Sequence, residues 1–250
     1  GLGFGLKWMM GWMNDNLQFF KKDPVYRRHH HNEITFSLAY TFTEHFMLPL
    51  SHDEVVYGKK SLLEKMPGDS WQQFANLRLL FSWMYLHPGA KLIFMGGEFG
   101  QRQEWQFESQ LNWWEAGSES HHGVFEVIKS LNRLYRNEKA LHEMNYDYSS
   151  FEWLELNDSE NSVLSFIRKG TEESLVCVLN LTPIPRNDYR IGAPEAGEYE
   201  LIFNSDQKQY WGSDYDLPAK VKTQAIAWHG RENSLSLEIP PLGAIVYKIK

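Results

Sequence analysis

An apolar segment of the chain ends abruptly in a histidine and two carboxylates. The segment Met47–Leu50 is followed by Ser51, and then directly by His52, Asp53 and Glu54. At the carboxyl end of a strand in an α/β protein, side chains point into the crevice where ligands bind. The cluster is therefore a candidate polar site. Because ordinary loops are also acidic, the same residues equally fit a solvated turn after a strand.

Two other runs of residues contain the residue types of a dinucleotide-binding motif and of a metal site, but their spacing does not support either. The run Gly96–Gly100 follows the apolar segment Lys91–Met95, but it lacks the spacing and the following βαβ unit of a dinucleotide-binding motif. The adjacent residues His29, His30 and His31 point in different directions, and no cysteine or carboxylate stands at ligand spacing. We therefore predict neither a metal nor a cofactor.

Charge and composition favour a neutral, hydroxyl-rich ligand. The 250 residues include 25 basic and 32 acidic side chains, for a net charge of −7. This balance gives no electrostatic reason to expect nucleic acid or an anionic membrane as a partner. Phe, Trp and Tyr make up 15% of the chain, and flat rings stack on the apolar faces of sugars. Most of these rings also fit a large aromatic core.

The remaining global features concern the cell compartment and the ends of the chain. No stretch approaches the roughly 18 apolar residues of a membrane span. The single cysteine, Cys177, lies in the apolar run Leu175–Leu179, so we expect a buried, unpaired thiol, which is compatible with a reducing compartment. The chain begins at Gly1 in sequence that looks structured, and we interpret it as a piece of a longer protein.

The chain divides into two regimes of secondary-structure signals. Up to about residue 140, short apolar runs alternate with helical patterns, as in repeated β/α units. Beyond about residue 142, short segments rich in β-branched or aromatic residues are separated by turn residues, which is typical of an all-β sandwich. The expected helices are 32–40, 70–86 and a third around 124–135, the first capped by Asn32. The expected strands are 46–50, 91–95, 151–156, 163–167, 175–181, 199–203, 235–239 and 245–249.

Five motifs in order along the chain resemble the 1,4-α-glucan (glycogen) branching enzymes of the α-amylase superfamily. They are Gly11–Asp15, His30–Ser37, Leu50–Val56, Phe94–Gln101 and Asn204–Asp206, and the match continues in register to 240–243. The resemblance implies an α/β plus all-β fold: the second half of a (β/α)₈ barrel over residues 1–141, then a C-terminal antiparallel β-sandwich over 142–250. It also implies a cytoplasmic enzyme of glycogen biosynthesis that transfers an α-1,4-glucan segment to a 6-hydroxyl. Its partner would be an α-glucan such as glycogen or a maltooligosaccharide.

The resemblance assigns roles to two residues of the polar cluster. Retaining attack on a glycosidic bond needs a carboxylate nucleophile and a carboxylic acid about 5–5.5 Å apart. By resemblance, Asp53 is a third carboxylate, which grips hydroxyls of the reacting sugar, and His52 hydrogen-bonds the same ring. The nucleophile and the general acid would lie on earlier barrel strands, in an N-terminal half upstream of Gly1. We therefore expect the chain alone to be inactive.

Other carboxylates near the motifs are poor substitutes for the missing pair. The resemblance gives Asp15, Glu54, Glu98 and Glu104 no such role, and retaining chemistry does not tolerate misplaced groups. Glu98 is expected to organise the loop after its strand.

Several tryptophans are candidates for sugar stacking. Trp8 and Trp105 are predicted to bind substrate on the active face. Trp12 and Trp113 could also line the cleft, whereas core packing is favoured for Trp114.

Two alternatives to a branching enzyme stay open. The chain could be a non-catalytic glucan-binding fragment, or part of a related amylase or trehalose-forming hydrolase. Departures from the family pattern at Met9, Asn14, Tyr57 and Asn112 leave the transferred chain length and the shape of the acceptor site open.

Overall fold

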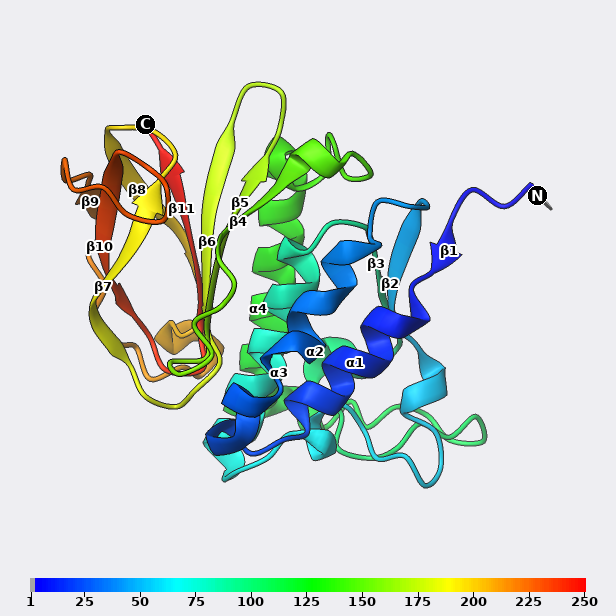
Figure 1. Cartoon of the computed structure of the whole chain (residues 1–250). Helices are drawn as coiled ribbons and strands as arrows, with labels where there is room; N and C mark the ends of the chain where they lie inside the picture. The colour runs from blue at the N-terminus through cyan, green and yellow to red at the C-terminus, as the bar shows by residue number, and fades with distance from the viewer. Residues whose placement is uncertain (1–2) are drawn as a thin grey trace.

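The chain has a parallel α/β part and an antiparallel β part, with helices α3 and α4 between them (Figure 1). The computed structural model describes residues 3–250. In the α/β part, three parallel strands lie in the order β1-β2-β3. These strands are β1 (Lys7–Trp8), β2 (Phe46–Leu50) and β3 (Ala90–Ile93). The helices are α1 (Met10–Phe20), α2 (His31–Thr35), α3 (Ser70–Leu86) and α4 (Glu119–Asn137).

Helix α3 is buried along most of its length. It begins with a capping box, in which the Asp69 carboxylate accepts from Gln72 N at 2.9 Å and Gln72 Oε1 accepts from Asp69 N at 3.1 Å. It ends at Leu86, and its C-terminal cap His87 lies directly before Pro88, which cannot continue a helix. Every residue from Phe74 to Leu86 is buried, as expected of a helix that is apolar on all faces. The predicted span 70–86 is confirmed.

The C-terminal part consists of antiparallel strands in two sheets. A six-stranded sheet has the order β4-β5-β6-β11-β8-β9, and a two-stranded sheet pairs β10 with β7. The strands are β4 (Phe151–Glu155), β5 (Val163–Lys169), β6 (Ser174–Asn180), β7 (Arg186–Ala193), β8 (Glu198–Asn204), β9 (Lys220–Lys222), β10 (Asn233–Ile239) and β11 (Ala244–Ile249). The predicted antiparallel sandwich is confirmed, and so is each of its expected strands to within two residues at either end.

The six-stranded sheet is covered on both faces, which explains why β5 and β6 are continuous apolar runs. Alternate side chains point to opposite faces of a strand. Val176 and Val178 of β6 face the core between the two sheets, whereas Leu175, Cys177 and Leu179 face the core that contains α3. Cys177 is a buried free thiol, as predicted, and burial raises its pKa to about 12.

Buried arginines join the α/β part to the β part. Arg168 on β5 donates to Leu86 O at the end of α3 at 2.6 Å, to Leu141 O at 3.2 Å and to Ser150 O at 3.3 Å. Its guanidinium is fully buried, and desolvation lowers its pKa to about 10. The geometry satisfies carbonyl groups that the ends of several elements would otherwise leave unpaired.

Two further arginines make the same kind of connection elsewhere in the interface. Arg27 donates to Leu181 O at 2.8 Å and to Asn76 Oδ1 at 2.7 Å, and burial lowers its pKa to about 9. Arg78 of α3 donates to Ser205 O at 3.2 Å, and burial lowers its pKa to about 10.

The structure corrects several details of the α/β part. The first expected helix begins at His31 after an N-terminal cap at His30, so Asn32 is not its cap. It ends at Thr35, and the chain continues as a 3-10 helix over Phe36–Ala39. Helix α1 was not predicted because its glycine and asparagines are poor helix formers. Burial of Trp12, Leu17 and other apolar side chains on its inner face overrides that preference.

Strands β7 and β9 were also not predicted. The first half of β7 is polar and largely exposed, and β9 is a three-residue edge strand with two lysines. Such edge strands carry little of the apolar alternation by which strands are recognised.

The described residues also form short 3-10 helices at Pro24–His29, Phe36–Ala39, His52–Glu54, Leu63–Lys65, Gly97–Phe99, Glu115–Gly117, Lys139–Leu141, Tyr148–Ser150 and Lys208–Tyr210. Within residues 3–250, no helix is both long enough and apolar enough to cross a membrane.

Replacing Arg168 by methionine is expected to lower the free energy of unfolding by about 3–5 kcal/mol. The change keeps most of the apolar volume but leaves buried carbonyl groups without donors. Urea unfolding of the wild-type and variant chains measures the difference. Arg133→Met, at an exposed position of α4, is the control and should change stability by less than about 0.5 kcal/mol. Equal effects of the two changes would contradict a stabilising role of Arg168.

Candidate active site

The predicted polar cluster lies at the carboxyl end of β2. The strand ends at Leu50, and a 3-10 turn, His52–Glu54, begins immediately after Ser51. Ser51 caps this turn: its hydroxyl accepts from Asp53 N at 3.4 Å and lies 3.5 Å from Asp53 Oδ2. The strand and its capped turn thus fix the position of His52 and Asp53 at the carboxyl-terminal end of the parallel sheet.

His52 and Asp53 form an accessible pair. The His52 Nε2 atom lies 3.2 Å from Asp53 Oδ1. Their side chains are 48% and 43% exposed, so a ligand can reach both. The pair offers carboxylate acceptors beside an imidazole, which can hydrogen-bond neighbouring hydroxyls of one sugar ring.

Two aromatic rings support the imidazole. The centroid of the His52 ring lies 5.8 Å from that of Phe94 and 6.5 Å from that of Trp105. Phe94 and Trp105 pack edge to face at 5.2 Å. The structure therefore brings three of the predicted site residues together: His52, Asp53 and Trp105.

Backbone hydrogen bonds hold these rings in place. Phe94 N donates to Leu50 O at 3.0 Å, and Trp105 N donates to Val55 O at 2.8 Å. A cavity of about 20 Å³ lies against these residues and the glycines after β3. This volume suits about one water molecule, so a sugar would bind on the open surface of the site.

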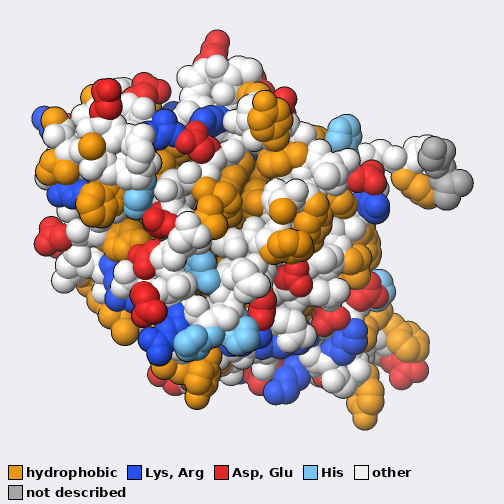
Figure 2. Space-filling view, in the orientation of Figure 1, with side chains coloured by type: hydrophobic (Ala, Val, Ile, Leu, Met, Phe, Trp, Pro, Cys, Tyr) orange, Lys and Arg blue, Asp and Glu red, His pale blue; other side chains and the backbone are white. Residues whose placement is uncertain are grey.

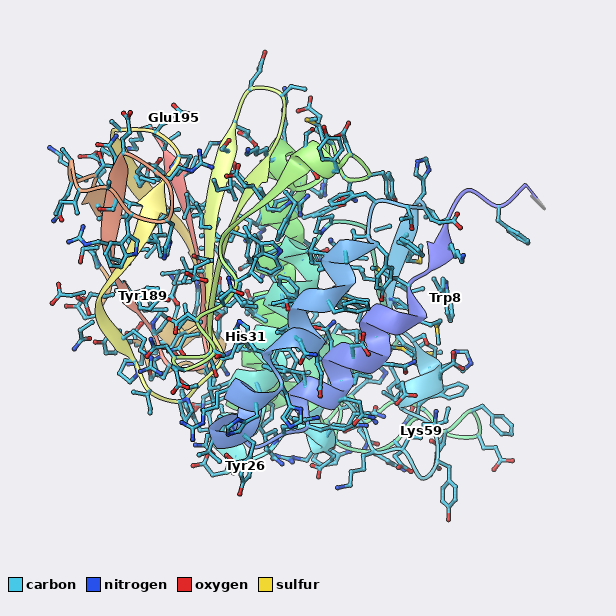
Figure 3. All side chains as sticks on the ribbon, viewed as in Figure 1. Trp8, Tyr26, His31, Lys59, Tyr189 and Glu195 are labelled. Carbon is cyan, nitrogen blue, oxygen red and sulfur yellow. The ribbon has the colours of Figure 1, made fainter. Side chains whose placement is uncertain are left out.

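Trp8, the fourth predicted site residue, lies on the neighbouring strand. It ends β1, pairs with Met47 of β2 and is 39% exposed. Figure 3 shows Trp8 on the side of the molecule away from the β-sandwich. It lies in the same sheet as β2, but its strand ends opposite Met47, before the end of β2 at Leu50.

The other tryptophans differ from expectation. Trp12 of α1 is fully buried, so of the two places left open for it the structure shows the core and not the cleft. Trp114 is 77% exposed, so the favoured core position is wrong. Trp113 is 57% exposed and packs on Phe99 at 5.2 Å. Trp113 and Trp114 lie in a long loop, where the pattern of apolar residues in the sequence does not determine burial.

The remaining carboxylates near the motifs are dispersed. Glu54 pairs with Lys59 at 3.0 Å. Glu98 lines a groove along β3 together with Met95. Asp15 lies on α1, where partial burial, and then the charge of Glu33, raise its pKa.

The three consecutive histidines have separate environments. His30 Nδ1 lies 2.7 Å from Glu33 Oε1, and His29 accepts from Arg28 Nε at 3.2 Å. His31 is buried, and desolvation lowers its pKa. Across residues 3–250, no group of three or more His, Cys, Asp or Glu side chains is placed to hold a metal ion.

Asn204–Asp206, one of the motifs that carry the resemblance, has a structural role. The Asp206 carboxylate accepts from Ser213 N at 2.8 Å, from Ser213 Oγ at 2.6 Å and from Tyr215 N at 3.2 Å. These bonds fold the loop after β8, whose Trp211 packs on Phe74 of α3 at 5.3 Å.

Sequence reasoning missed two residues that shape the site. Phe94 looked like the end of an apolar strand, and only its contact with His52 reveals its role. Lys65 resembled an ordinary surface lysine, but it is 6% exposed and its ammonium group donates to the carbonyls of Lys59 and Lys60. Burial lowers its pKa to about 8.

Solved structures of carbohydrate-active enzymes share this fold. The alpha-amylase from H. orenii matches with a TM-score of 0.59 at 17% identity and covers 99% of this chain and 49% of its own. The debranching enzyme from Nostoc punctiforme matches with a TM-score of 0.62 at 14% identity, over 95% of this chain and 46% of its own. At these identities the likeness concerns the fold alone.

Sequence comparison gives a more specific relation. The family model of the alpha amylase C-terminal all-beta domain matches residues 153–250. The 1,4-alpha-glucan branching enzyme GlgB of Aquifex aeolicus is 54% identical over 99% of this chain and 40% of its own length. The same enzyme of Cereibacter sphaeroides is 52% identical over 98% of this chain and 34% of its own length. The chain, which spans two fifths or less of these relatives, is therefore a homologue of the C-terminal part of the 1,4-alpha-glucan branching enzymes.

Proposed function

We propose that the chain is the C-terminal part of a 1,4-α-glucan branching enzyme, which transfers an α-1,4-glucan segment to a 6-hydroxyl with retention. The observation that carries this proposal is the accessible His52–Asp53 pair at the end of β2, in a chain that is about half identical to branching enzymes along its whole length. Glycogen or a maltooligosaccharide would be the substrate. No cofactor is needed for this chemistry.

In this reaction His52 and Asp53 hold the sugar and do not attack it. The Asp53 carboxylate accepts hydrogen bonds from hydroxyls of the reacting ring, and His52 bonds the same ring. Such bonds strengthen as the ring distorts towards the oxocarbenium-like transition state. The nucleophile and the general acid belong to barrel strands that precede Gly1. The partly buried rings of Phe94 and Trp105 form an apolar surface beside His52.

We further propose that residues 1–141 are the second half of a (β/α)₈ barrel and that residues 142–250 are a separate β-sandwich domain. The parallel order β1-β2-β3, with helices between the strands, supports this assignment. A groove along β3, lined by Met95, Ile128, Tyr135 and other residues, would receive the missing half of the barrel. A cytoplasmic location is part of the proposal, and the buried free thiol of Cys177 fits it.

A second candidate is a glucan-binding protein without catalysis. The exposed rings of Trp113 and Trp114 favour this alternative. An Asp nucleophile and a Glu acid on strands upstream of Gly1 would decide for the enzyme.

The 250-residue chain by itself is expected to have no branching activity, because it contains neither of the two reacting carboxylates in this proposal. Purified chain is incubated with labelled maltooligosaccharide and amylose, and the product is treated with a debranching enzyme. Release of label from new branches would contradict the assignment of the reacting groups to the upstream strands.

In the protein that joins this chain to its upstream strands, Asp53→Asn is expected to lower kcat by about 10²–10³-fold. The amide keeps the size of the side chain but loses the charge that stabilises the transition state. Rates of branch formation on amylose measure the effect. Glu108→Gln, an exposed position in the loop after β3, is the control and should leave kcat unchanged. A kcat of Asp53→Asn equal to that of the control would refute the role of Asp53.

A further inference from the structure

Tyr57 is an aromatic side chain that projects into solvent beside the candidate active site. It lies three residues after Glu54, the last residue of the 3-10 turn that carries His52 and Asp53, and is 88% exposed. Figure 2 shows hydrophobic side chains protruding at the lower right of the molecule, where Figure 1 places the loops after β2 and β3. Lys59, two residues further along, is labelled in the same region of Figure 3.

The backbone around Tyr57 is held by a carboxylate from the other loop. Glu104 Oε2 accepts from Gly58 N at 3.0 Å, and Glu104 Oε1 accepts from Lys60 N at 2.5 Å. Gly58 and Lys60 both have left-handed backbone angles, with φ of 81° and 64°. This conformation turns nearby N–H groups towards one point and makes a small anion-binding concavity. The same hydrogen bonds lower the pKa of Glu104.

The opposite side of the turn is held by a lysine. The buried ammonium group of Lys65 donates to the carbonyls of Lys59 and Lys60, the latter at 2.9 Å. Lys59 itself pairs with Glu54 at 3.0 Å. Glu104 therefore binds N–H groups of this turn, and Lys65 binds its carbonyl groups. Such charge-assisted hydrogen bonds are stronger than those between neutral groups.

The residue after Glu104 connects the turn to the polar pair. Trp105 N donates to Val55 O at 2.8 Å, and the Trp105 ring packs against His52. Glu104 and Trp105 thus fasten one loop to the other at adjacent positions. Any shift of Glu104 would move Tyr57 relative to His52 and Asp53.

The turn around Tyr57 is held in place before any ligand binds, so its exposed ring can serve as a preorganised binding surface. A tyrosine ring has few rotatable bonds, so little conformational entropy is lost when a ligand covers it. Holding its backbone in advance removes a further cost of binding. The flat face of the ring suits the apolar face of a glucose unit, and neighbouring Glu54 and Glu104 offset the charges of Lys59 and Lys65.

We propose that Tyr57 stacks on a glucose unit of the glucan bound at the Asp53 site, and that Glu104 is the positioning residue that holds Tyr57 there. This inference rests on the proposed function and deepens it, because it names a contact that sets substrate affinity. Glu104 does not touch the substrate. It acts through the turn that carries Tyr57.

The test uses the protein that joins this chain to its upstream strands, with amylose as substrate. Tyr57→Ala is expected to raise KM about five- to tenfold, with kcat changed less than about twofold, since stacking supplies binding in both ground and transition states. Tyr57→Phe keeps the ring and should stay near the wild-type KM. Tyr148→Ala removes another highly exposed ring, which is 77% accessible and lies before β4, and should leave both constants unchanged.

The role of Glu104 is tested by a double-mutant cycle. Glu104→Gln loses the charge and one acceptor, so KM should rise while kcat stays within about twofold. Tyr57→Ala/Glu104→Gln should have no higher KM than Tyr57→Ala alone, because the two residues act through one contact. Hydrogen exchange of the amides of Gly58 and Lys60 should speed up in Glu104→Gln and not in Tyr57→Ala.

The outcomes separate this inference from the proposed function. An active wild-type enzyme with an unchanged KM in Tyr57→Ala would overturn the stacking contact, and additive effects in the double variant would overturn the role of Glu104. If the wild-type protein forms no branches, the proposed function fails. Retardation of the same variants in amylose-containing native gels then tests the contact: Tyr57→Ala must migrate faster than wild type, and equal mobility would refute it.

Discussion

The burial of α3 on every side is the constraint on which the rest of the structure depends. Residues Phe74–Leu86 lie between the parallel strands and the six-stranded sheet, and none of them faces water. A helix of this kind must be covered by both parts of the chain. The sheet must in turn be apolar on both faces, which β5 and β6 are. The two parts therefore share one continuous core.

Within such a core, some backbone carbonyl groups have no hydrogen-bond donor from their own element, and buried arginines supply the donors. Where elements end inside the interface, their carbonyl groups have no water to bond. Arg168 reaches the end of α3, and Arg27 reaches Leu181 in the β part. A guanidinium offers several donors in a rigid plane and stays charged even when burial lowers its pKa, so it can serve several carbonyls at once.

This rigid framework ends at the carboxyl ends of β2 and β3, where the site begins. Strand β2 carries His52 and Asp53, and the loop after β3 carries Trp105. The two loops are fastened to each other by Trp105 N and by Glu104. The polar pair is thus held on a rigid base, with the rings of Phe94 and Trp105 beside it. That arrangement is compatible with the role that we propose for the pair, which is to orient a sugar ring.

The sequence alone located the candidate pair His52 and Asp53 at the end of a strand, and it located six of the eight strands of the β part. His52 and Asp53 follow a strongly apolar strand, and turn residues separate the expected strands of the β part, so local pattern sufficed to locate these elements. The role of His52 and Asp53 rests on the family resemblance and not on that pattern. Only the tertiary structure decided the places of Trp12 and Trp114, the helical state of α1, the role of Phe94 and the fastening of Tyr57 by Glu104. Each of these depends on contacts between residues distant in sequence or on burial in a loop. Such contacts override local propensity and leave no periodic signal in the chain.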